Sequence, residues 1–449
     1  MRLRLQLFIL ALTGLSFYPP LPASEPDYLS YERPTPGTVL DESGAFAESP
    51  GGQTGEAEWK RRLKQRAANL EEFFWDDATI LLQPRTYYLD KRRSGSADSE
   101  AWAAGGALQY RSGSFRDRLR LGTTLYTSQK LYGPADKGET LLLKPVQNGF
   151  SVLGEAYAEA GLTETVDLRL YRQSLNLPFV NRQDNRMVPN TFEAYSLLDA
   201  RSSHFNYVVS QITRMKPRDA TSFIHMSEAA GADNTDKGLT MLGGRYRFSP
   251  LIDIGAINHH AWDVMNIFYA EANAARELTN GFALRLSGQY TAQKSTGDEL
   301  VGDFDTGMYG AKLAMSYNSL ILTLARTSVD RNSGIRTPYG GYPGYTSILV
   351  EDFNRAGEDA WLIGLSCDFA RIGLDGLSAF SNYVRGDTPD RGNAASPDQK
   401  ELDFTLDYRP GGSLLKGLWI RARAGFVDRN HAGDINDYRI IVNYSVPLH

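Results

Sequence analysis

The sequence has little cysteine, no long apolar run in its body and no basic block. Its 449 residues include a single cysteine, Cys367, which can form no internal disulfide and cannot build a zinc site from several cysteines. After the first twenty or so residues, no stretch approaches the roughly 18 apolar residues of a membrane-spanning helix, which excludes a helical membrane bundle. The isoelectric point of about 5.8 argues against a protein that binds nucleic acid, because such binding depends on clustered cations.

Recognisable catalytic and metal-binding motifs are also missing. The sequence contains no Gly-x-Ser-x-Gly motif. The pairs Gly243–Gly244 and Gly340–Gly341 do not open predicted helices, so phosphate binding is unsupported. The pair His259–His260 would need further ligands to hold a metal, and the sequence marks none. We therefore expect no catalytic residue, no metal and no cofactor, and we expect that the protein is not an enzyme.

Aromatic residues and alternating segments are abundant instead. The chain has 24 tyrosines and 20 phenylalanines, and 42% of its residues are hydrophobic, too many for a disordered chain. From about Thr79 onward, segments of roughly ten residues alternate apolar with polar or small side chains. In residues 402–408, which read LDFTLDY, the apolar side chains share one face of a strand and the aspartates share the other. A soluble sandwich would bury the apolar face, whereas a membrane barrel exposes it to lipid.

The spacing of the breaks distinguishes these two architectures. Short turns are predicted near Ser112, Gly161, Arg201, Ser249, Asn280, Asn318, Ile372 and Gly411, and longer connections at about 93–100, 128–149, 173–191, 216–238, 294–305, 330–358, 386–399 and 428–436. Turns and longer connections alternate, except that the connection at 258–263 is short where a long one is expected. The sequence therefore predicts an all-β fold, a transmembrane antiparallel β-barrel of about 18 strands with short periplasmic turns and long extracellular loops.

The N-terminal part differs from the barrel in composition. Residues 1–23 predict a cleaved secretory signal peptide, because two arginines precede an apolar core and a small residue. Residues 24–55 are rich in Pro, Gly and Ser and predict a flexible periplasmic leader. Apolar residues at helical spacing predict an amphipathic helix over 56–74, either a solvated tether or a docking element. The barrel is then expected to occupy residues 75–449.

Several segments carry a resemblance to a known family. The stretch CDFARIGLDGLSAFSNYVRGD, from Cys367, combines an Asp-Phe pair, a Gly-Leu-x-Gly-Leu turn and a strand that ends in Arg-Gly. The next hairpin joins an acidic strand to a Leu-x-x-Arg-x-Arg strand that begins at Leu418. Together with Arg85–Tyr88, Val188–Glu193 and the stretch from Gly243, these segments resemble the OprD-type porins, the outer-membrane carboxylate channels. The resemblance implies a monomeric barrel whose third long loop folds inward and whose lumen carries a ladder of arginines.

Arginines on the polar faces of the strands are the candidate pore-lining residues. Arg421 and Arg423 match the family pattern and share one strand face. Five further arginines also fall on polar faces: Arg118, Arg120, Arg169, Arg245 and Arg247. A guanidinium group suits this role because it binds a carboxylate through two hydrogen bonds and remains charged at any working pH. For each of them, a structural ion pair is an equally good alternative to contact with a solute.

Acidic residues and the long loops complete the candidate site. Glu401, Asp403 and Asp407 share the inward face of one strand, and a basic wall that faces an acidic wall would favour zwitterionic or mixed-charge solutes. The third long loop carries Arg182, Asp184 and Arg186, which would line the eyelet if the loop folds inward. The longest connection carries Tyr339, Tyr342 and Tyr345, and we expect it to be a plain surface loop.

These features predict an outer-membrane porin for the passive, selective uptake of small carboxylate-bearing or zwitterionic solutes through an arginine-lined lumen. The expected partners are small organic solutes, outer-membrane lipid, lipopolysaccharide and the barrel assembly machinery, with no nucleic acid. A monomer is expected, and a trimer remains open. Two alternatives also remain open: a barrel enzyme that acts on lipid, and a structural or adhesive barrel with a blocked lumen. The chain ends in His449, whereas outer-membrane barrels typically end in an aromatic residue.

Overall fold

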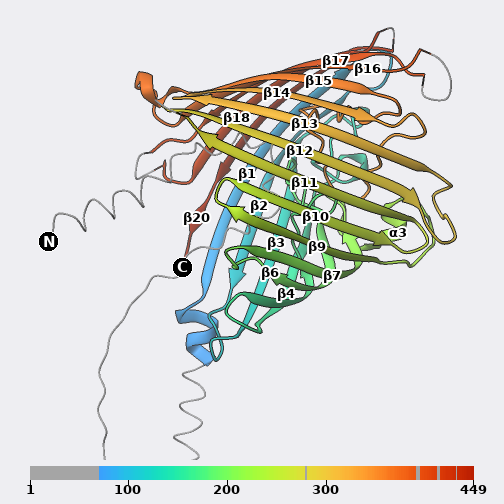
Figure 1. Cartoon of the computed structure of the whole chain (residues 1–449). Coiled ribbons are helices and arrows are strands. Elements are labelled where there is room, and N and C mark those ends of the chain that lie inside the picture. Colours follow the sequence, from blue (N-terminus) through green and yellow to red (C-terminus); the bar gives the residue numbers. More distant parts are fainter. Residues whose placement is uncertain (1–69, 279–280, 391–394, 412–414, 431) are drawn as a thin grey trace, which may run out of the picture.

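The barrel is a single closed sheet. The computed structural model describes residues 70–278, 281–390, 395–411, 415–430 and 432–449. Within them, eighteen long antiparallel strands each pair with the next, and the last long strand, β19, returns to pair with β1 (Figure 1). Two further strands have only two residues each and attach to β7 and β1. The predicted all-β barrel of about 18 strands is therefore confirmed.

The strands are long enough to cross a membrane at a tilt. Their bounds are β1 (Thr79–Arg93), β2 (Ser99–Arg111), β3 (Leu119–Tyr132), β4 (Phe150–Gly161), β5 (Val166–Gln173), β6 (Thr191–Asp199), β7 (Phe205–Lys216), β8 (Ile224–His225), β9 (Leu239–Ser249), β10 (Ile252–Ala261), β11 (Met265–Glu277), β12 (Phe282–Ser295), β13 (Asp305–Tyr317), β14 (Leu320–Val329), β15 (Asp359–Asp368), β16 (Leu377–Asp387), β17 (Gln399–Tyr408), β18 (Leu418–Asp428), β19 (Ile435–Tyr444) and β20 (Val446–Pro447). The helical elements are η2 (Glu72–Asp76), η3 (Pro145–Gln147), α3 (Met226–Ala229) and η4 (Phe369–Ile372).

Strand β17 shows which medium each face of the wall meets. Its buried positions are Gln399, Glu401, Asp403, Thr405 and Asp407, and its exposed positions are Lys400, Leu402, Phe404, Leu406 and Tyr408. Polar side chains thus point inward and most apolar ones point outward, the reverse of a soluble protein. Phe404 is 48% exposed, and a whole band of such residues is stable only against lipid, because water would not solvate it favourably.

The longest connections lie at the end of the barrel opposite the two-residue turns. The turns β9–β10 and β13–β14 contain two residues each, whereas the loops β3–β4 and β5–β6 contain seventeen each. The short connection that interrupted the sequence pattern is real, because only residues 262–264 join β10 to β11. Three long connections matter for the site and are named here: loop 3 (residues 174–190), loop 4 (217–238) and loop 7 (330–358).

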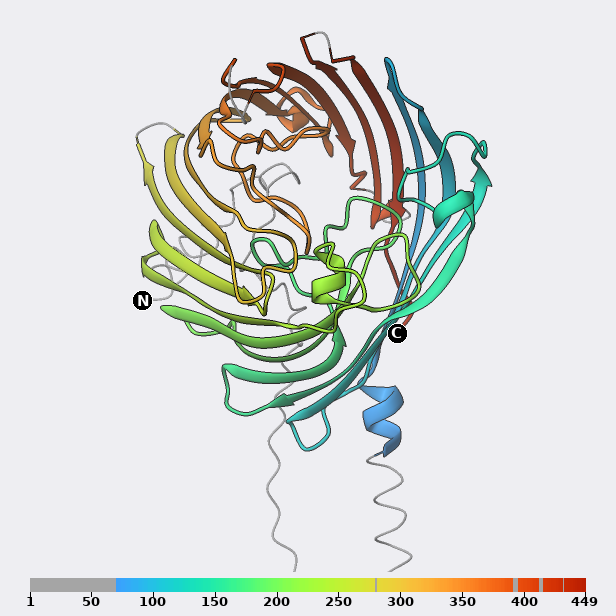
Figure 2. The same cartoon turned by 90° about the vertical axis from the view of Figure 1, so that its right-hand side faces the viewer.

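Loops 3 and 7 fold into the barrel and form an apolar core there. Figure 2 shows both loops crossing the interior of the ring of strands. The ring of Phe179 in loop 3 lies 6.1 Å from that of Tyr269 on β11 and 6.2 Å from that of Tyr342 in loop 7. Phe179 and Tyr339 are fully buried. The prediction of a plain surface loop at 330–358 is therefore wrong, because its tyrosines pack against apolar residues of loop 3 and the inner wall.

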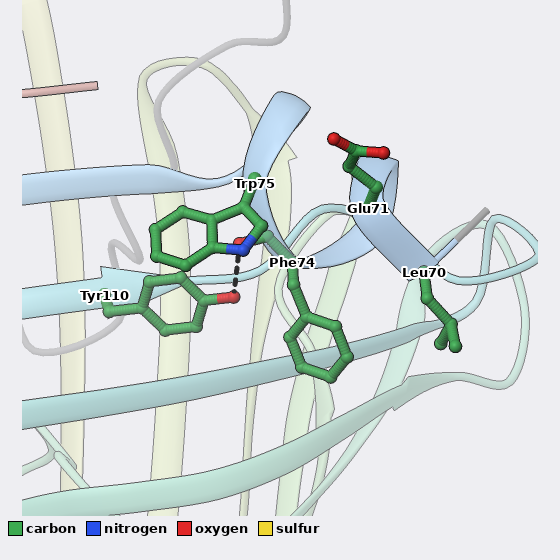
Figure 3. Close-up of a pocket in the computed structure, with 5 residues that line it drawn as sticks. All are labelled: Leu70, Glu71, Phe74, Trp75 and Tyr110. Atoms are coloured by element: carbon green, nitrogen blue, oxygen red, sulfur yellow. Dashed lines mark hydrogen bonds between the residues drawn. The ribbon is translucent and has the colours of Figure 1, made fainter. Parts of the chain in front are cut away.

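The segment before the barrel is described only at its end. The predicted signal peptide (1–23), the leader (24–55) and residues 56–69 of the predicted helix lie outside the described residues. The described part ends with η2, and Phe74 in it accepts a hydrogen bond from the Tyr110 hydroxyl at 2.9 Å (Figure 3). The ring of His449 contacts the carbonyl of Trp75 at 2.7 Å, which joins the two ends of the barrel sequence. No described helix is both long and apolar enough to cross a membrane.

Candidate functional site

Loops 3 and 7 contact each other inside the barrel. The side-chain amide of Asn181 in loop 3 donates to the carbonyl of Gly341 at 3.1 Å, and its oxygen accepts from the Gly341 amide at 2.8 Å. A methyl group on the neighbouring Gly340 would lie 2.6 Å from the Asn181 oxygen, so this close approach requires glycine. The two loops therefore act as one partition inside the barrel.

The charges of loop 3 are tied to the inner wall. Arg85 on β1 contacts the Asp184 carboxylate at 2.6 Å, and Arg182 contacts its other oxygen at 2.9 Å. Burial by itself would raise the pKa of Asp184, but the two guanidinium groups outweigh burial and lower that pKa to about 2. Asp184 is therefore a carboxylate at every working pH, and it neutralises part of the positive charge of the eyelet.

Three other guanidinium groups form no ion pair with a carboxylate among the described residues. Arg186 in loop 3 donates to the carbonyls of Thr140 and Asn185. Arg218 in loop 4 donates to the side-chain oxygen of Asn185. Burial lowers the pKa of Arg186, and the positive charge of Arg439 lowers it further. Burial also lowers the pKa of Arg218, and the positive charge of Arg186 adds to this effect. The arginines thus lie close enough to repel one another.

Arg423 on β18 is the third member of this group, which we call the unpaired arginines (Arg186, Arg218 and Arg423). Its Nε donates to the Thr405 hydroxyl at 3.0 Å, and its guanidinium carbon lies 5.9 Å from the centre of the Phe380 ring. All three side chains are half-buried. Across the described part of the chain, none of the three has a carboxylate within ion-pair distance.

Arg421, the other arginine of the family pattern, has a different environment. Its Nε and Nη2 donate to the two carboxylate oxygens of Asp407 at 2.7 Å each. The Trp419 indole donates to the same carboxylate at 2.7 Å and lies beneath the guanidinium. Both members of the pair are nearly buried. The strand parity predicted from the sequence is thus observed, but this arginine is engaged by a neighbouring strand.

Two of the predicted arginines share one carboxylate. Arg169 on β5 donates to Glu159 at 3.1 Å and lies over the Tyr157 ring, and Arg120 on β3 lies 3.5 Å from the same carboxylate. Arg118 lies in the exposed turn before β3, which begins at Leu119, so it is not part of the wall that carries Arg120.

The two predicted arginines of β9 are also engaged. Arg245 contacts Asp253 on β10 and lies 3.3 Å from Glu271 on β11. Arg247 donates to the side-chain oxygen of Asn206. Arg245 therefore forms a structural ion pair, which is the alternative to solute contact given in the sequence analysis. The unpaired arginines form no such pair.

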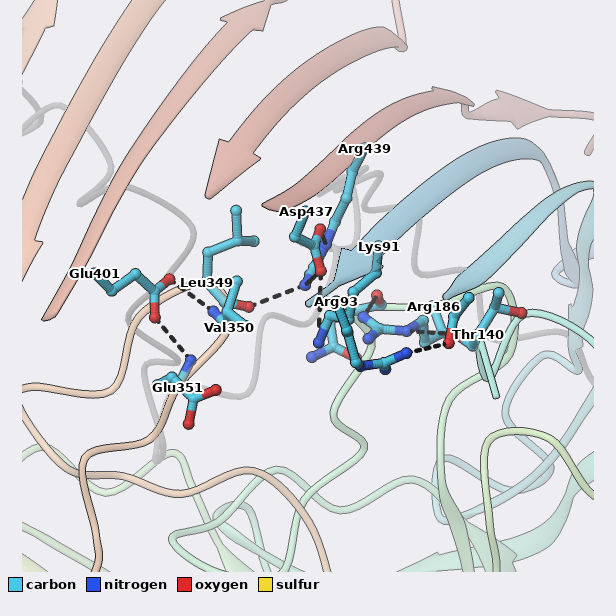
Figure 4. A network of polar contacts seen from close by, with 12 residues as sticks. Lys91, Arg93, Thr140, Arg186, Leu349, Val350, Glu351, Glu401, Asp437 and Arg439 are labelled. Atoms are coloured by element: carbon cyan, nitrogen blue, oxygen red, sulfur yellow. Dashed lines mark hydrogen bonds and ion pairs between the residues drawn. The ribbon is translucent and has the colours of Figure 1, made fainter. Parts of the chain in front are cut away.

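Two acidic residues of β17, Glu401 and Asp403, are buried. The Glu401 carboxylate accepts hydrogen bonds from the backbone amides of Val350 and Glu351, both at 2.8 Å (Figure 4). Asp403 accepts from the Asn382 backbone and side chain at 3.0 and 3.2 Å. The prediction that basic and acidic walls face each other is not what the structure shows, because β17 pairs directly with β18 and its charges meet lateral neighbours or the loop.

Sequence reasoning missed the basic residues of β1, β19 and loop 4. Arg439 on β19 binds Asp437 at 2.6 and 2.9 Å and also donates to the Leu349 carbonyl in loop 7 (Figure 4). Lys91 on β1 lies 3.6 Å from the same aspartate. The alternation in residues 438–440 predicts an inward position for Arg439, by the same argument as for Arg421. No local sequence pattern marks Arg218.

These features define a class of protein. A closed eighteen-stranded barrel with an apolar outer band, a charged lumen and loops that narrow it is an outer-membrane diffusion porin. Among the described residues, no group of three or more His, Cys, Asp or Glu side chains is arranged to hold a metal ion.

Comparison with known proteins gives the particular family. A family model described as outer membrane porin, OprD family, matches residues 72–448, and the chain belongs to this family. Porin D of Pseudomonas aeruginosa is 23% identical over 415 residues, which cover 84% of this chain and 92% of that protein. The porin-like protein GalP of Pseudomonas putida is 23% identical over 393 residues, with 84% and 94% covered.

The fold has close solved counterparts. The crystal structure of Pseudomonas aeruginosa OccK9 (OpdG) superposes with a TM-score of 0.76 at 24% identity and covers 84% of this chain and all of its own. The chain is therefore a substrate-specific channel of the outer membrane. The relatives named above are porins or porin-like proteins.

Proposed function

We propose that this channel passes small carboxylate-bearing or zwitterionic solutes, and that the unpaired arginines form their path. The observation that carries the proposal is the contrast within the lumen. Arg120, Arg169, Arg245 and Arg421 each contact a carboxylate, whereas Arg186, Arg218 and Arg423 contact only neutral oxygens. A solute carboxylate can supply the acceptor that the protein withholds from these three groups.

The three arginines come from loop 3, loop 4 and β18, so an anion can move between donors held by separate elements. Each contact replaces part of the hydration of the carboxylate, and a series of modest contacts permits both selection and release. Passage requires no energy coupling and no chemical step, in agreement with the expectation that the protein is not an enzyme.

Reconstitution in planar bilayers tests the proposal. The variant R186Q/R218Q/R423Q should lower the permeability for benzoate and shift the reversal potential in a KCl gradient toward cation selectivity. The matched control is R421Q/D407N, which alters the lumen with similar substitutions but removes one positive and one negative charge together. Loss of a charge-assisted hydrogen bond corresponds to roughly tenfold in affinity.

The outcomes separate the hypotheses. Unchanged benzoate permeability in the triple variant, or an equal loss in the control, would contradict the role of the unpaired arginines. A reconstituted protein with no conductance would favour the blocked barrel, and hydrolysis of phospholipid by the purified protein would favour the lipid enzyme.

The proposal also covers the export of the protein, its assembly and the membrane around it. Residues 1–23 act as a cleaved signal peptide, residues 24–55 as a periplasmic leader, and residues 56–74 as part of a helix that precedes the barrel, whose first strand begins at Thr79. Assembly depends on the barrel assembly machinery, the functional unit is the monomer, and lipopolysaccharide surrounds the outer half of the barrel. Support comes from the residue pattern of the N-terminus and from the apolar outer band.

A further inference from the structure

A row of cations crosses the outer surface of the barrel near the long-loop end of β14 to β17. Arg326 pairs in register with Trp361, Trp361 with Arg385, and Arg385 with Lys400. All four side chains are on the outward face and exposed. At ~4.8 Å per strand, Arg326 and Lys400 are about 14 Å apart. We call these four residues the rim patch.

Apolar side chains lie directly below the rim patch. The next row of outward side chains lies two residues closer to the short-turn end of each strand. Its members, in register, are Leu324, Ile363, Tyr383, Leu402 and Phe426. Leu324 is 39% exposed and Ile363 is 44% exposed. The Tyr383 ring lies 5.5 Å from that of Trp361, so an aromatic pair joins the two rows. This row belongs to the lipid-facing band.

The vertical order of these rows matches an amphiphile that carries negative charge. Acyl chains fit the apolar row, and anionic groups directly above them meet three cations and an indole. The long-loop end of an outer-membrane barrel faces the outer leaflet, whose lipid is lipopolysaccharide. We propose that the rim patch binds the lipid A part of lipopolysaccharide, with its phosphates on Arg326, Arg385 and Lys400 and its acyl chains on the apolar row below.

Each cation has a carboxylate neighbour, and these pairs are weak. Arg326 lies 3.4 Å from Asp359, Arg385 lies 2.8 Å from Asp387, and Lys400 lies 2.8 Å from Asp428. The six side chains are between 44% and 71% exposed. Exposed pairs of this kind contribute about 0–1 kcal/mol, so a phosphate can take over the cation. A divalent cation can then bridge the released carboxylate to a second phosphate.

The corresponding row elsewhere on the barrel is different. On β9 to β12, the outward positions in register near the long-loop end are Thr240, His260, Asn266 and Lys294. This row contains one lysine and no arginine. One of its members, Asn266, exchanges two amide hydrogen bonds with Asn258 in the row below, which also holds Leu242 and Phe268. The concentration of charge on β14 to β17 is thus a local feature and not a general property of the rim.

Native mass spectrometry of the refolded barrel in detergent tests the proposal. The probe is purified lipid A, compared with dephosphorylated lipid A and with phosphatidylglycerol. The variant R326Q/R385Q/K400Q should reduce the fraction of barrels that carry lipid A by about tenfold or more. The control variant R92Q/R214Q/K294Q removes three exposed cations that lie on separate strands, and it should bind lipid A within twofold of the wild type.

Folding and function are checked on the same preparations. Heat-modifiable mobility on gels shows whether each variant forms the barrel, and R385Q alone, with a smaller expected loss, replaces the triple variant if that fails to refold. Equal lipid A binding by wild type and rim variant, equal loss in the control, or equal binding of dephosphorylated lipid A or phosphatidylglycerol would each overturn the proposal. The proposal deepens the contact with lipopolysaccharide named above, and unchanged benzoate permeability in the rim variant separates it from the role of the lumen arginines.

Discussion

Arg421 and Asp407 form a two-point ion pair between adjacent strands, with both donor–acceptor distances at 2.7 Å. Two residues further along the same face, Arg423 donates to the hydroxyl of Thr405 and lies near the Phe380 ring. The two arginines of one sequence motif therefore have different environments: the first forms an ion pair that connects β18 to β17, and the second contacts a neutral hydroxyl.

Replacing Arg421 should affect stability more than selectivity. R421A leaves the nearly buried Asp407 without its cation, and breaking a buried pair in this way costs about 3–5 kcal/mol. Urea unfolding in lipid vesicles measures the loss. The double variant R421A/D407A should recover part of the stability, because it removes the unpaired charge. A double variant that is less stable than R421A would contradict the assignment.

Replacing Arg423 should show the opposite pattern. R423Q retains a donor for Thr405 but removes the positive charge, so the free energy of unfolding should change by no more than about 1 kcal/mol. The benzoate permeability should fall clearly in planar bilayers. R423K, which keeps a positive charge without the planar fork, should have intermediate permeability. Equal permeability for all three proteins would exclude contact between this residue and the solute.

The contact between loops 3 and 7 should control the size of the opening. N181A removes the two hydrogen bonds with Gly341 and leaves half-buried backbone groups without these partners, at up to about 1–3 kcal/mol for each. We expect more frequent transitions to states of higher conductance in single-channel recordings. N332A, at an exposed position of loop 7, is the matched control and should behave as the wild type does.

The anchor of loop 7 on β17 gives a related prediction. The Glu401 carboxylate accepts from two backbone amides with its two oxygens, and E401Q can offer only one oxygen to them. Current noise should therefore rise in E401Q. The control N332A lies at an exposed position of the same loop, away from these amides, and should leave the noise unchanged. A quiet E401Q channel would show that other contacts suffice to hold the loop.

The charge of Asp184 predicts a response to acid. Its pKa of about 2 in the folded state is below the value of about 3.9 expected in an unfolded chain. The stabilisation of loop 3 by this carboxylate is therefore complete above about pH 4 and is lost as the pH falls through about 2. Conductance should acquire additional noise in that acidic range in the wild type. D184N should already be noisy at pH 7 and should lack the acid-induced step.

The fold could be predicted from the sequence because its main signal is local. The alternation in β17 depends only on the period of two of a strand, and the short turns are marked by Gly, Asn and Ser. The inward position of Arg421 and Arg423 followed from the same parity. The partner of each arginine could not be read in this way, since Arg421 meets an aspartate and Arg423 a threonine at neighbouring register positions.

The path of the long loops depends on distant contacts. Nothing near Tyr342 in the sequence indicates that its ring meets Phe179, more than 160 residues earlier, inside the barrel. Arg218 enters the lumen for the same reason, because loop 4 follows the surface that loop 3 creates. A tyrosine-rich loop with Gly and Pro is compatible with either a surface or an interior position, and only the tertiary packing decides between them.

The ladder of hydrogen bonds around eighteen strands fixes the circumference of the wall, yet part of the interior is filled by the partition of loops 3 and 7. The width of the passage can thus change while the circumference of the wall stays the same. A change of a few residues in loop 7 can widen or narrow the passage without disturbing any strand pair, so channels of one circumference can sieve solutes of quite different sizes.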